Sequence, residues 1–252
     1  MLPLRDQLNG LLTILMYTFR KVILSRRIVI TLLIAAFVAV VALYVGGQDV
    51  ERLKDGTNLL DSLILFFFMP VLAMIYGSSL LRDEMDDRSI TQVVTSPMDR
   101  LFIYTGYYLG LVVSVSALML IVLTAGFLSF FGRAGIDGDA MGIYGSMAGL
   151  MVIGSIVYSA LFMAVSVILD RPIYFGLFYA FIWEAFIGSL PGKIGTLAVK
   201  HYVRSIGAGW IHYGEISEFP ASSMGDSAWV LFILTVILFV FGAYMFREKE
   251  FA

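Results

Sequence analysis

The sequence predicts an all-α membrane protein that crosses the bilayer six times. Of its 252 residues, 60% are hydrophobic and 14% are charged, which leaves too little polar surface to solvate a globule of this size. Five uncharged apolar runs, and a sixth interrupted only by Glu184, reach about the 20 residues that a helix needs to span a bilayer. Every loop is shorter than a soluble domain of about 50 residues, so residues 1–252 form one transmembrane domain. The predicted spans are residues 28–46, 62–81, 101–131, 141–169, 173–190 and 227–246.

An amphipathic pattern precedes the first span, over residues 4–25. Apolar residues from Leu4 to Ile23 recur at helical spacing and form one stripe, whereas Asn9 and Thr13 fall on the other side. This pattern is typical of an elbow helix that lies in the headgroup plane, where basic residues contact anionic lipid. A cytoplasmic extension of the first span is the alternative. The basic residues assigned to the membrane surface are Arg20, Lys21, Arg26 and Arg27.

Lysine and arginine are unevenly divided between the two faces that the six spans define. Of the 17 such residues, 11 fall on the face that carries both termini and 6 fall on the other. Basic residues in short loops are retained on the cytoplasmic side of a membrane. The sequence therefore predicts a multi-pass protein of the cell (plasma) membrane with both termini in the cytoplasm.

The loop after the second span holds the densest charge in the chain, from Arg82 to Arg88. Acidic residues in the first turns of a helix are stabilised by its dipole, and Ser96-Pro97 ends the element because the residue before a proline disfavours helix. A sparse apolar face favours a short, partly amphipathic cytoplasmic helix over the alternative of a hydrated turn. Its apolar residues are Met85, Ile90, Val93 and Val94.

Glu184 is the one charged residue inside a predicted span. A carboxylate at membrane depth is costly and usually faces a helix bundle or a cavity. One interpretation places Glu184 on a polar pathway, at a gate or in a seam between subunits. The other has its side chain extending toward the outer interface.

The stretch from Gly192 to Phe219 is too polar for a seventh span and too apolar for a plain loop. Apolar and basic residues, among them Ile194, Lys200 and Arg204, are interleaved along it. The pattern predicts a short interfacial or re-entrant helix on the outer face, before the last span. An outer gate and an amphipathic lid without a gating role are both compatible with it.

Two Gly-x-x-x-Gly pairs lie in the predicted spans, Gly106 with Gly110 and Gly145 with Gly149. Such pairs allow two helix backbones to approach closely. Because six spans must first pack with one another, the pairs favour contacts within the chain over contacts between chains.

In the charged loop the chain resembles the permease subunits of ABC-2 type transporters. Their loop between spans two and three typically carries a Glu, then Thr-Leu, several apolar positions, Pro, two residues, Arg, and a Gly a few residues into span three. The layout of elbow helix, six spans, loop helix and outer helix is similar over the whole chain. Departures are Arg88, Ser89 and Tyr107, where Gly, Thr and Lys are common. The residues that stand at the positions of this pattern, in register and without a gap, are Glu84, Ser89, Ile90, Pro97, Arg100 and Gly106.

The resemblance implies a permease that exports or extrudes a substrate and is powered by a separate ABC-type ATP-binding subunit. This chain would be a non-catalytic subunit without a cofactor of its own, because ATP and Mg²⁺ would bind the partner. A second permease copy or a paralogue would complete the pathway as a homodimer or heterodimer, with Glu184 a candidate pathway or gate residue. The loop would form a coupling helix, whose implied contacts with the ATP-binding subunit are Asp83, Glu84, Asp86, Asp87, Arg88 and Ser89.

The motifs that the sequence lacks narrow the functional classes. There is no Gly-x-x-x-x-Gly-Lys-Ser/Thr, no His-Glu-x-x-His and no Gly-x-Ser-x-Gly, which disfavours ATP binding in this chain, a metalloprotease and a serine hydrolase. Asp137-Gly138-Asp139 is interpreted as a turn that caps the fourth span rather than a cation loop. Nothing indicates nucleic acid as a partner. The alternative function is a membrane anchor or regulatory subunit of an enzyme or assembly complex without transport of its own.

Overall fold

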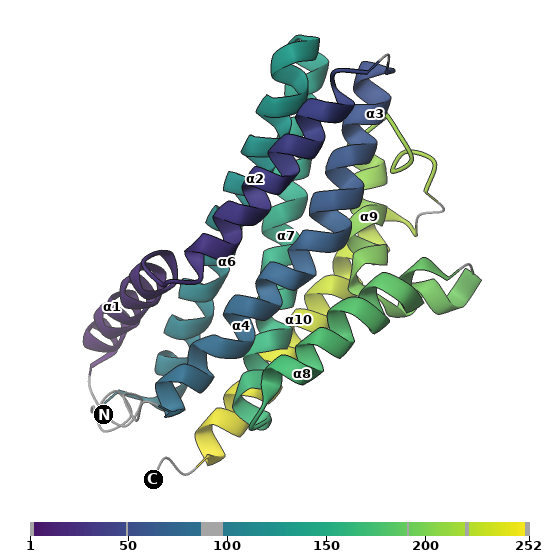
Figure 1. The fold of residues 1–252 in the computed structure, drawn as a ribbon. Helices are drawn as coiled ribbons and strands as arrows, with labels where there is room; N and C mark the ends of the chain where they lie inside the picture. The colour runs from purple at the N-terminus through teal and green to yellow at the C-terminus, as the bar shows by residue number, and fades with distance from the viewer. Residues whose placement is uncertain (1–2, 49, 87–97, 191, 220–221, 250–252) are drawn as a thin grey trace.

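The computed structural model describes residues 3–48, 50–86, 98–190, 192–219 and 222–249, and every regular element in these ranges is a helix. Six helical stretches are long and apolar enough to cross a membrane (Figure 1). The predicted all-α class with six spans is therefore confirmed. The stretches are Ile28–Val45, Arg52–Met85, Arg100–Arg133, Gly138–Ile168, Pro172–Ser189 and Met224–Glu248.

Four of the spans are single α-helices, and two change helix type along their length. The second span joins α3, the π-helical η1 and α4, while the fifth joins α8, the π-helical η2 and the short 3₁₀ turn η3. The single helices are α2 (Ile28–Val45), α6 (Arg100–Ala134), α7 (Gly138–Ile168) and α10 (Met224–Glu248). The composite spans are α3 (Arg52–Leu59), η1 (Leu60–Phe68) and α4 (Met69–Asp86), then α8 (Pro172–Leu177), η2 (Phe178–Phe186) and η3 (Ile187–Ser189). Outside the spans lie α1 (Leu4–Ile23), η4 (Gly192–Leu197) and α9 (Val199–Trp210).

The second span is longer than the apolar run at 62–81 that predicts it. The helix begins at Arg52 and continues to Asp86, so charged turns extend it at both ends. Charged residues end an apolar run but do not end a helix, because lysine, arginine and glutamate are good helix formers. As a result, one continuous helical rod joins the two faces of the bundle (Figure 1).

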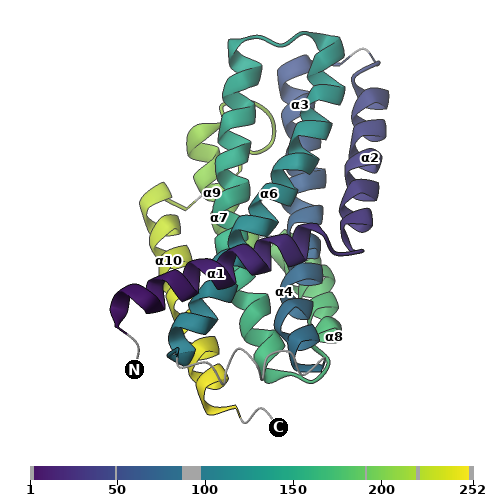
Figure 2. The same ribbon diagram turned by 90° about the vertical axis from the view of Figure 1, so that its left-hand side faces the viewer.

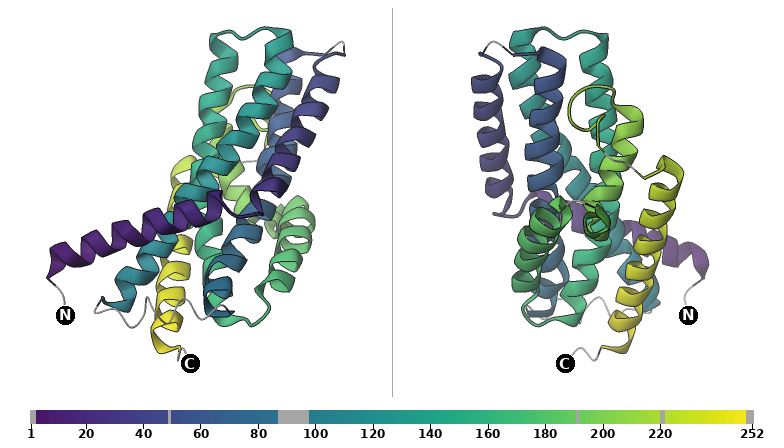
Figure 3. Two further views of the ribbon diagram at one scale, coloured as in Figure 1. Left: turned by 60° about the vertical axis from the view of Figure 1, so that its left-hand side comes forward. Right: turned by 90° about the vertical axis from the view of Figure 1, so that its right-hand side faces the viewer.

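Spans two, three and four form the centre of the bundle, and spans one, five and six lie around it (Figure 3). In the most apolar window of each span, 67%, 50% and 67% of the residues of spans two, three and four are buried. The values for the peripheral spans one, five and six are 22%, 28% and 22%. Of these three spans, α2 and α10 are apolar all round, as expected for helices that face lipid or another membrane chain.

Helix α1 lies across the bundle and packs against α6 (Figure 2). A Cβ atom added at Gly110 would lie 2.6 Å from Thr18 Cβ, and one added at Gly106 would lie 3.0 Å from Ile14 Cβ. The pair therefore permits an approach that no larger residue would allow, which confirms the expected contact within the chain. Gly149 similarly accommodates Trp210 of α9, whereas nothing lies within 4 Å of a Cβ at Gly145.

Side-chain caps begin three of the spans. Asp99 accepts a hydrogen bond from Leu101 N at the start of α6, and Ser223 accepts one from Asp226 N at the start of α10. Asp137 accepts one from Ala140 N at 2.9 Å, so the Asp137-Gly138-Asp139 turn does cap the fourth span. Such caps satisfy backbone donors that a helix start leaves unpaired.

The two ends of the bundle are clearly separated (Figure 1). Helix α4 ends, α6 begins and α10 ends at one end, whereas α6 meets α7 at the opposite end, where α2 ends and α3 begins. The start of α1 and the end of α10, the first and last described helices, therefore lie toward one side, as an even number of spans requires.

Candidate functional site

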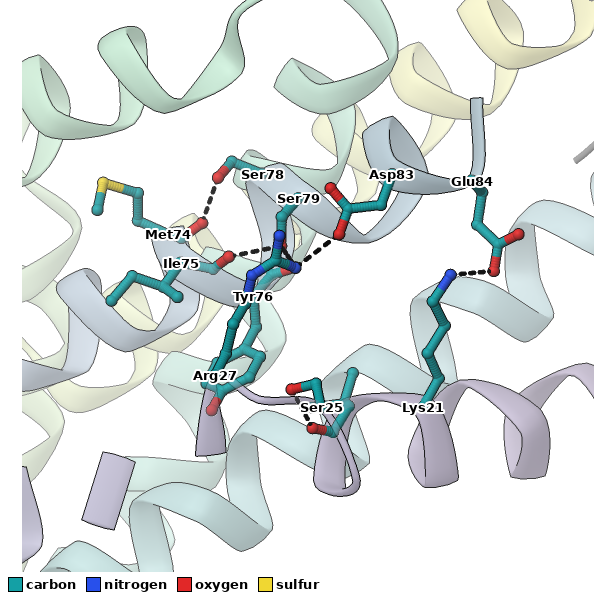
Figure 4. A network of polar contacts seen from close by, with 11 residues as sticks. Lys21, Ser25, Arg27, Met74, Ile75, Tyr76, Ser78, Ser79, Asp83 and Glu84 are labelled. Atoms are coloured by element: carbon teal, nitrogen blue, oxygen red, sulfur yellow. Dashed lines mark hydrogen bonds and ion pairs between the residues drawn. The ribbon is translucent and has the colours of Figure 1, made fainter. Parts of the chain in front are cut away.

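The base of the charged loop is attached to α1 by a buried ion pair. Glu84, in the last turn of α4, is 1% exposed. Its Oε1 accepts hydrogen bonds from Lys21 Nζ at 2.7 Å and from the Tyr17 hydroxyl at 2.9 Å (Figure 4 shows the lysine contact). The carboxylate, which the sequence assigns to the charged segment after the second span, thus points toward the N-terminal helix.

A second ion pair joins the same end of α4 to the turn between α1 and α2. Arg27 Nη1 lies 2.7 Å from Asp83 Oδ2 and donates to Ser79 Oγ at 2.6 Å (Figure 4). Both charged side chains of this pair are about one-third exposed. Because Asp83 and Glu84 are consecutive, adjacent charges on α4 hold both α1 and the turn that follows it.

The protonation of the α1 side chains fits these contacts. Burial, followed by the hydrogen bond to Glu84, raises the pKa of Tyr17, so its hydroxyl keeps the proton that it donates. Burial lowers the pKa of Lys21, but the hydrogen bond and the charge of Glu84 raise it more, and the result is an increase. The stabilisation that comes from the raised lysine pKa is present at neutral pH and is lost as pH rises above 10.5.

The turn between α7 and α8 also contacts α4. Arg82 Nη1 lies 3.1 Å from Asp170 Oδ1, and the Asp170 side chain is 91% exposed. Exposed ion pairs of this kind contribute little to stability. The contact nevertheless places the short 170–172 turn beside the charged end of the second span.

The sequence-predicted residues of the loop and elbow are only partly brought together. Lys21 and Arg27 pair with α4, whereas Arg20 and Arg26 are exposed. Asp83 and Glu84 lie side by side at the end of α4. Asp86 is the last residue of that helix, but its side chain, like all of Asp87, Arg88 and Ser89, lies outside the described residues.

Glu184 caps the N-terminus of α9. It is 0% exposed, and its carboxylate accepts hydrogen bonds from Val199 N at 3.0 Å, Lys200 N at 3.2 Å and the Tyr179 hydroxyl at 2.7 Å. An acidic group is stabilised at this position because the first N–H groups and the dipole of the helix point at it. The carboxylate is fully enclosed by these donors, and both interpretations from the sequence stay predictions.

Lys200, the second residue of α9, also reaches back to span five. Its Nζ donates to Ser189 Oγ at 3.1 Å and lies 3.5 Å from the centre of the Phe66 ring in span two. Two contacts therefore hold the start of α9 against span five. Glu184 accepts hydrogen bonds from the backbone of α9, and the Lys200 side chain of α9 donates to Ser189 in η3.

A further ion pair in this region was not expected from the sequence. Arg204 Nη2 of α9 lies 2.6 Å from Asp61 Oδ2 of η1. The sequence prediction starts the second span at residue 62, which leaves Asp61 in a loop. A charged residue next to a span, together with a basic residue in the outer segment, is the signal that points to such a pair, but it does not specify the partners.

Comparison with known proteins agrees with this architecture. A family model described as an ABC-2 family transporter protein matches residues 12–251, which include α6, α7, α9 and the ion pairs at both ends of the second span. A search of curated proteins gives no match.

Proposed function

The chain belongs to the ABC-2 transporter family, and on that premise we propose that it forms the membrane pathway of an ATP-driven exporter. It is a non-catalytic membrane component, as the family is, and ATP hydrolysis with its Mg²⁺ takes place on a separate ATP-binding subunit. The observation that supports the proposal is the second span: one helix runs from the outer face at Arg52 to the charged cytoplasmic end at Asp86.

A continuous helix of this kind suits the transmission of movement. Domain closure in a partner ATPase is a rigid-body rotation, and packed helices respond to such a rotation as units rather than by gradual deformation. The end of α4 is attached to α1 through Glu84 and to the turn after α1 through Asp83. A displacement of the loop therefore moves α1 together with the second span.

The proposed contact surface for the ATP-binding subunit is the charged loop. Acidic residues pair with basic residues on a partner and fix the orientation of docking. Glu84 is engaged by Lys21 in this structure, so it belongs to the base of the surface. The proposed contact residues are Asp83, Glu84, Asp86, Asp87, Arg88 and Ser89.

A second permease copy, or a related chain, completes the pathway in this proposal. Spans one, five and six bury less than one-third of their apolar windows within the chain. Apolar surface of that extent is available to lipid and to another membrane subunit alike. Glu184 is proposed to act at the outer gate of the pathway, because it holds the first turn of α9.

The experiment that tests the proposal is charge reversal in the loop, with Asp83, Asp86 and Asp87 each replaced by Lys. We expect the variant to insert normally, because the replaced residues follow the apolar part of the span. We also expect it to lose the ATP-binding subunit during purification in mild detergent, as measured by mass spectrometry of the co-purified chains.

Reversal of Asp139 and Glu218, two exposed acidic residues on the other side of the bundle, is the matched control and should leave co-purification unchanged. If the loop variant retains the ATP-binding subunit and its ATP hydrolysis, the loop is not the contact surface. If the unsubstituted chain co-purifies with no ATP-binding subunit, the result supports a membrane anchor instead.

A further inference from the structure

The segment between spans five and six, residues 192–219, contacts the second span at two points. Arg204 of α9 pairs with Asp61 at 2.6 Å, and the backbone N–H of Glu215 donates to Asn58 Oδ1 at 2.6 Å. Asn58 and Asp61 are three residues apart and therefore lie on one face of the helix. Movement of that face acts on α9 and on the turn after it together.

The Asp61–Arg204 pair is well enclosed. The two side chains are 3% and 17% exposed, and the Arg204 guanidinium lies 4.7 Å from the centre of the Phe219 ring. Because two charges lose their hydration on burial, such a pair is often no more stabilising than apolar residues of the same volume, and its best-attested role is to specify an arrangement. A role in positioning α9 agrees with this expectation.

The pair has unused capacity for hydrogen bonding. Within the part of the chain that the structure describes, Asp61 Oδ1 and Arg204 Nε are buried without a hydrogen-bond partner. A guanidinium can bind a carboxylate through one bond or through two parallel bonds. A small rotation or shift of the second span relative to α9 can therefore interconvert two distinct arrangements of the pair.

The same helix carries Asp61 at its outer half and the charged loop at its cytoplasmic end. Asp61 lies in the π-helical stretch η1 (Leu60–Phe68), and π-helical turns are frequent at functional sites within α-helices. We propose that Asp61 and Arg204 are positioning residues that couple displacement of the cytoplasmic loop to movement of α9 as the outer gate. This inference rests on the proposed permease function.

The experiment measures the position of α9 in the intact complex with the ATP-binding subunit. The chain contains no cysteine, so Ala208→Cys, at a half-buried position of α9, gives a single site for a membrane-impermeant maleimide. The labelling rate is compared without nucleotide and with ATP plus vanadate. With Asp61 and Arg204 intact, we expect the nucleotide to change the rate severalfold.

In this background, Asp61→Asn and Arg204→Gln should each abolish the nucleotide-dependent change while the complex still assembles. Because both substitutions remove the same contact, the double variant should lose no more than either single variant. Arg52→Gln is the matched control, since Arg52 forms an exposed ion pair with Asp137 at the outer end of the same helix. The control should keep the full response.

The possible results separate the inference from its premise. If Asp61→Asn and Arg204→Gln retain the severalfold change, the pair does not couple the loop to α9 and the inference is overturned, while the permease function stands. If the chain with its pair intact shows no nucleotide response, the proposed function fails, and the inference fails with it. A loss of the response in the two variants but not in Arg52→Gln supports the inference. Equal melting temperatures of these variants would show that the loss does not come from unfolding.

Discussion

Three buried acidic residues in this chain connect helices through ion pairs and hydrogen bonds. Glu84 joins α4 to α1, Asp61 joins η1 to α9, and Glu184 joins span five to the first turn of α9. Each of these three acidic residues is at most 2% exposed as a whole, and burial of an ionised group is costly unless donors surround it. The donors come from elements that are distant in sequence, so each contact links two parts of the fold.

The Glu184 contacts give a prediction for Glu184→Gln. Three donors converge on the carboxylate, and an amide offers one acceptor oxygen together with an NH₂ group that cannot accept. One backbone N–H of α9 then loses its charge-assisted bond, which costs about 1.5–3 kcal/mol, partly offset by the smaller desolvation cost of the neutral side chain. We expect a lower melting temperature in detergent and reduced substrate-stimulated ATP hydrolysis in reconstituted vesicles.

Glu218→Gln is the matched control for this substitution, because Glu218 is exposed in the same outer segment. It should change neither measurement. A Glu184→Gln chain that melts at the same temperature as the parent, or higher, would show that the cap does not stabilise α9.

At the scale of elements, the contact between α1 and α6 depends on the absence of side chains at two positions. A Cβ at Gly110 would lie 2.6 Å from Thr18 Cβ and 2.9 Å from Leu15 O. We predict that Gly110→Ala displaces α1 and destabilises the chain by about 1–3 kcal/mol, as overpacking usually does. Thermal unfolding in detergent measures the loss, and protease accessibility of α1 shows whether that helix detaches.

Gly145→Ala tests the same motif where space is open, since nothing lies within 4 Å of the added Cβ. Alanine is favoured over glycine inside a helix by about 0.5–1 kcal/mol, so this control should be neutral or slightly stabilising. Equal effects at Gly110 and Gly145 would mean that close approach to α1 does not explain the Gly106–Gly110 pair.

The sequence predicts the elements of this fold better than it predicts their contacts. Apolar runs locate all six spans, and the Gly106–Gly110 pair indicates a close helix contact, because both signals are local. The partner of Glu84 is Lys21, 63 residues earlier, and that of Asp61 is Arg204, 143 residues later. Such pairs depend on how each helix is rotated about its axis, which hydrophobic periodicity fixes poorly in helices that are apolar all round.

At the scale of the whole molecule, burial and charge describe one consistent arrangement. In their most apolar windows, spans two, three and four are at least half buried, and spans one, five and six are less than one-third buried within a single chain. Pairs of ionised residues lie at both ends of the second span, Arg52 with Asp137 at one end and Arg27 with Asp83 at the other. Apolar surface between two charged ends is what a bilayer requires of a protein that crosses it.

The charge count and the positions of the helix ends together predict the orientation. Since the side that carries the first and last helices holds 11 of the 17 basic residues, it should face the cytoplasm. A cysteine introduced at Gly138, an exposed position where nothing lies within 4 Å of an added Cβ, should react with an impermeant maleimide in intact cells. One introduced at Glu248, exposed at the end of α10, should react only after the membrane is permeabilised. Permeabilisation shows that both cysteines are reactive, so a Glu248→Cys chain labelled in intact cells would require an odd number of spans or the reverse orientation.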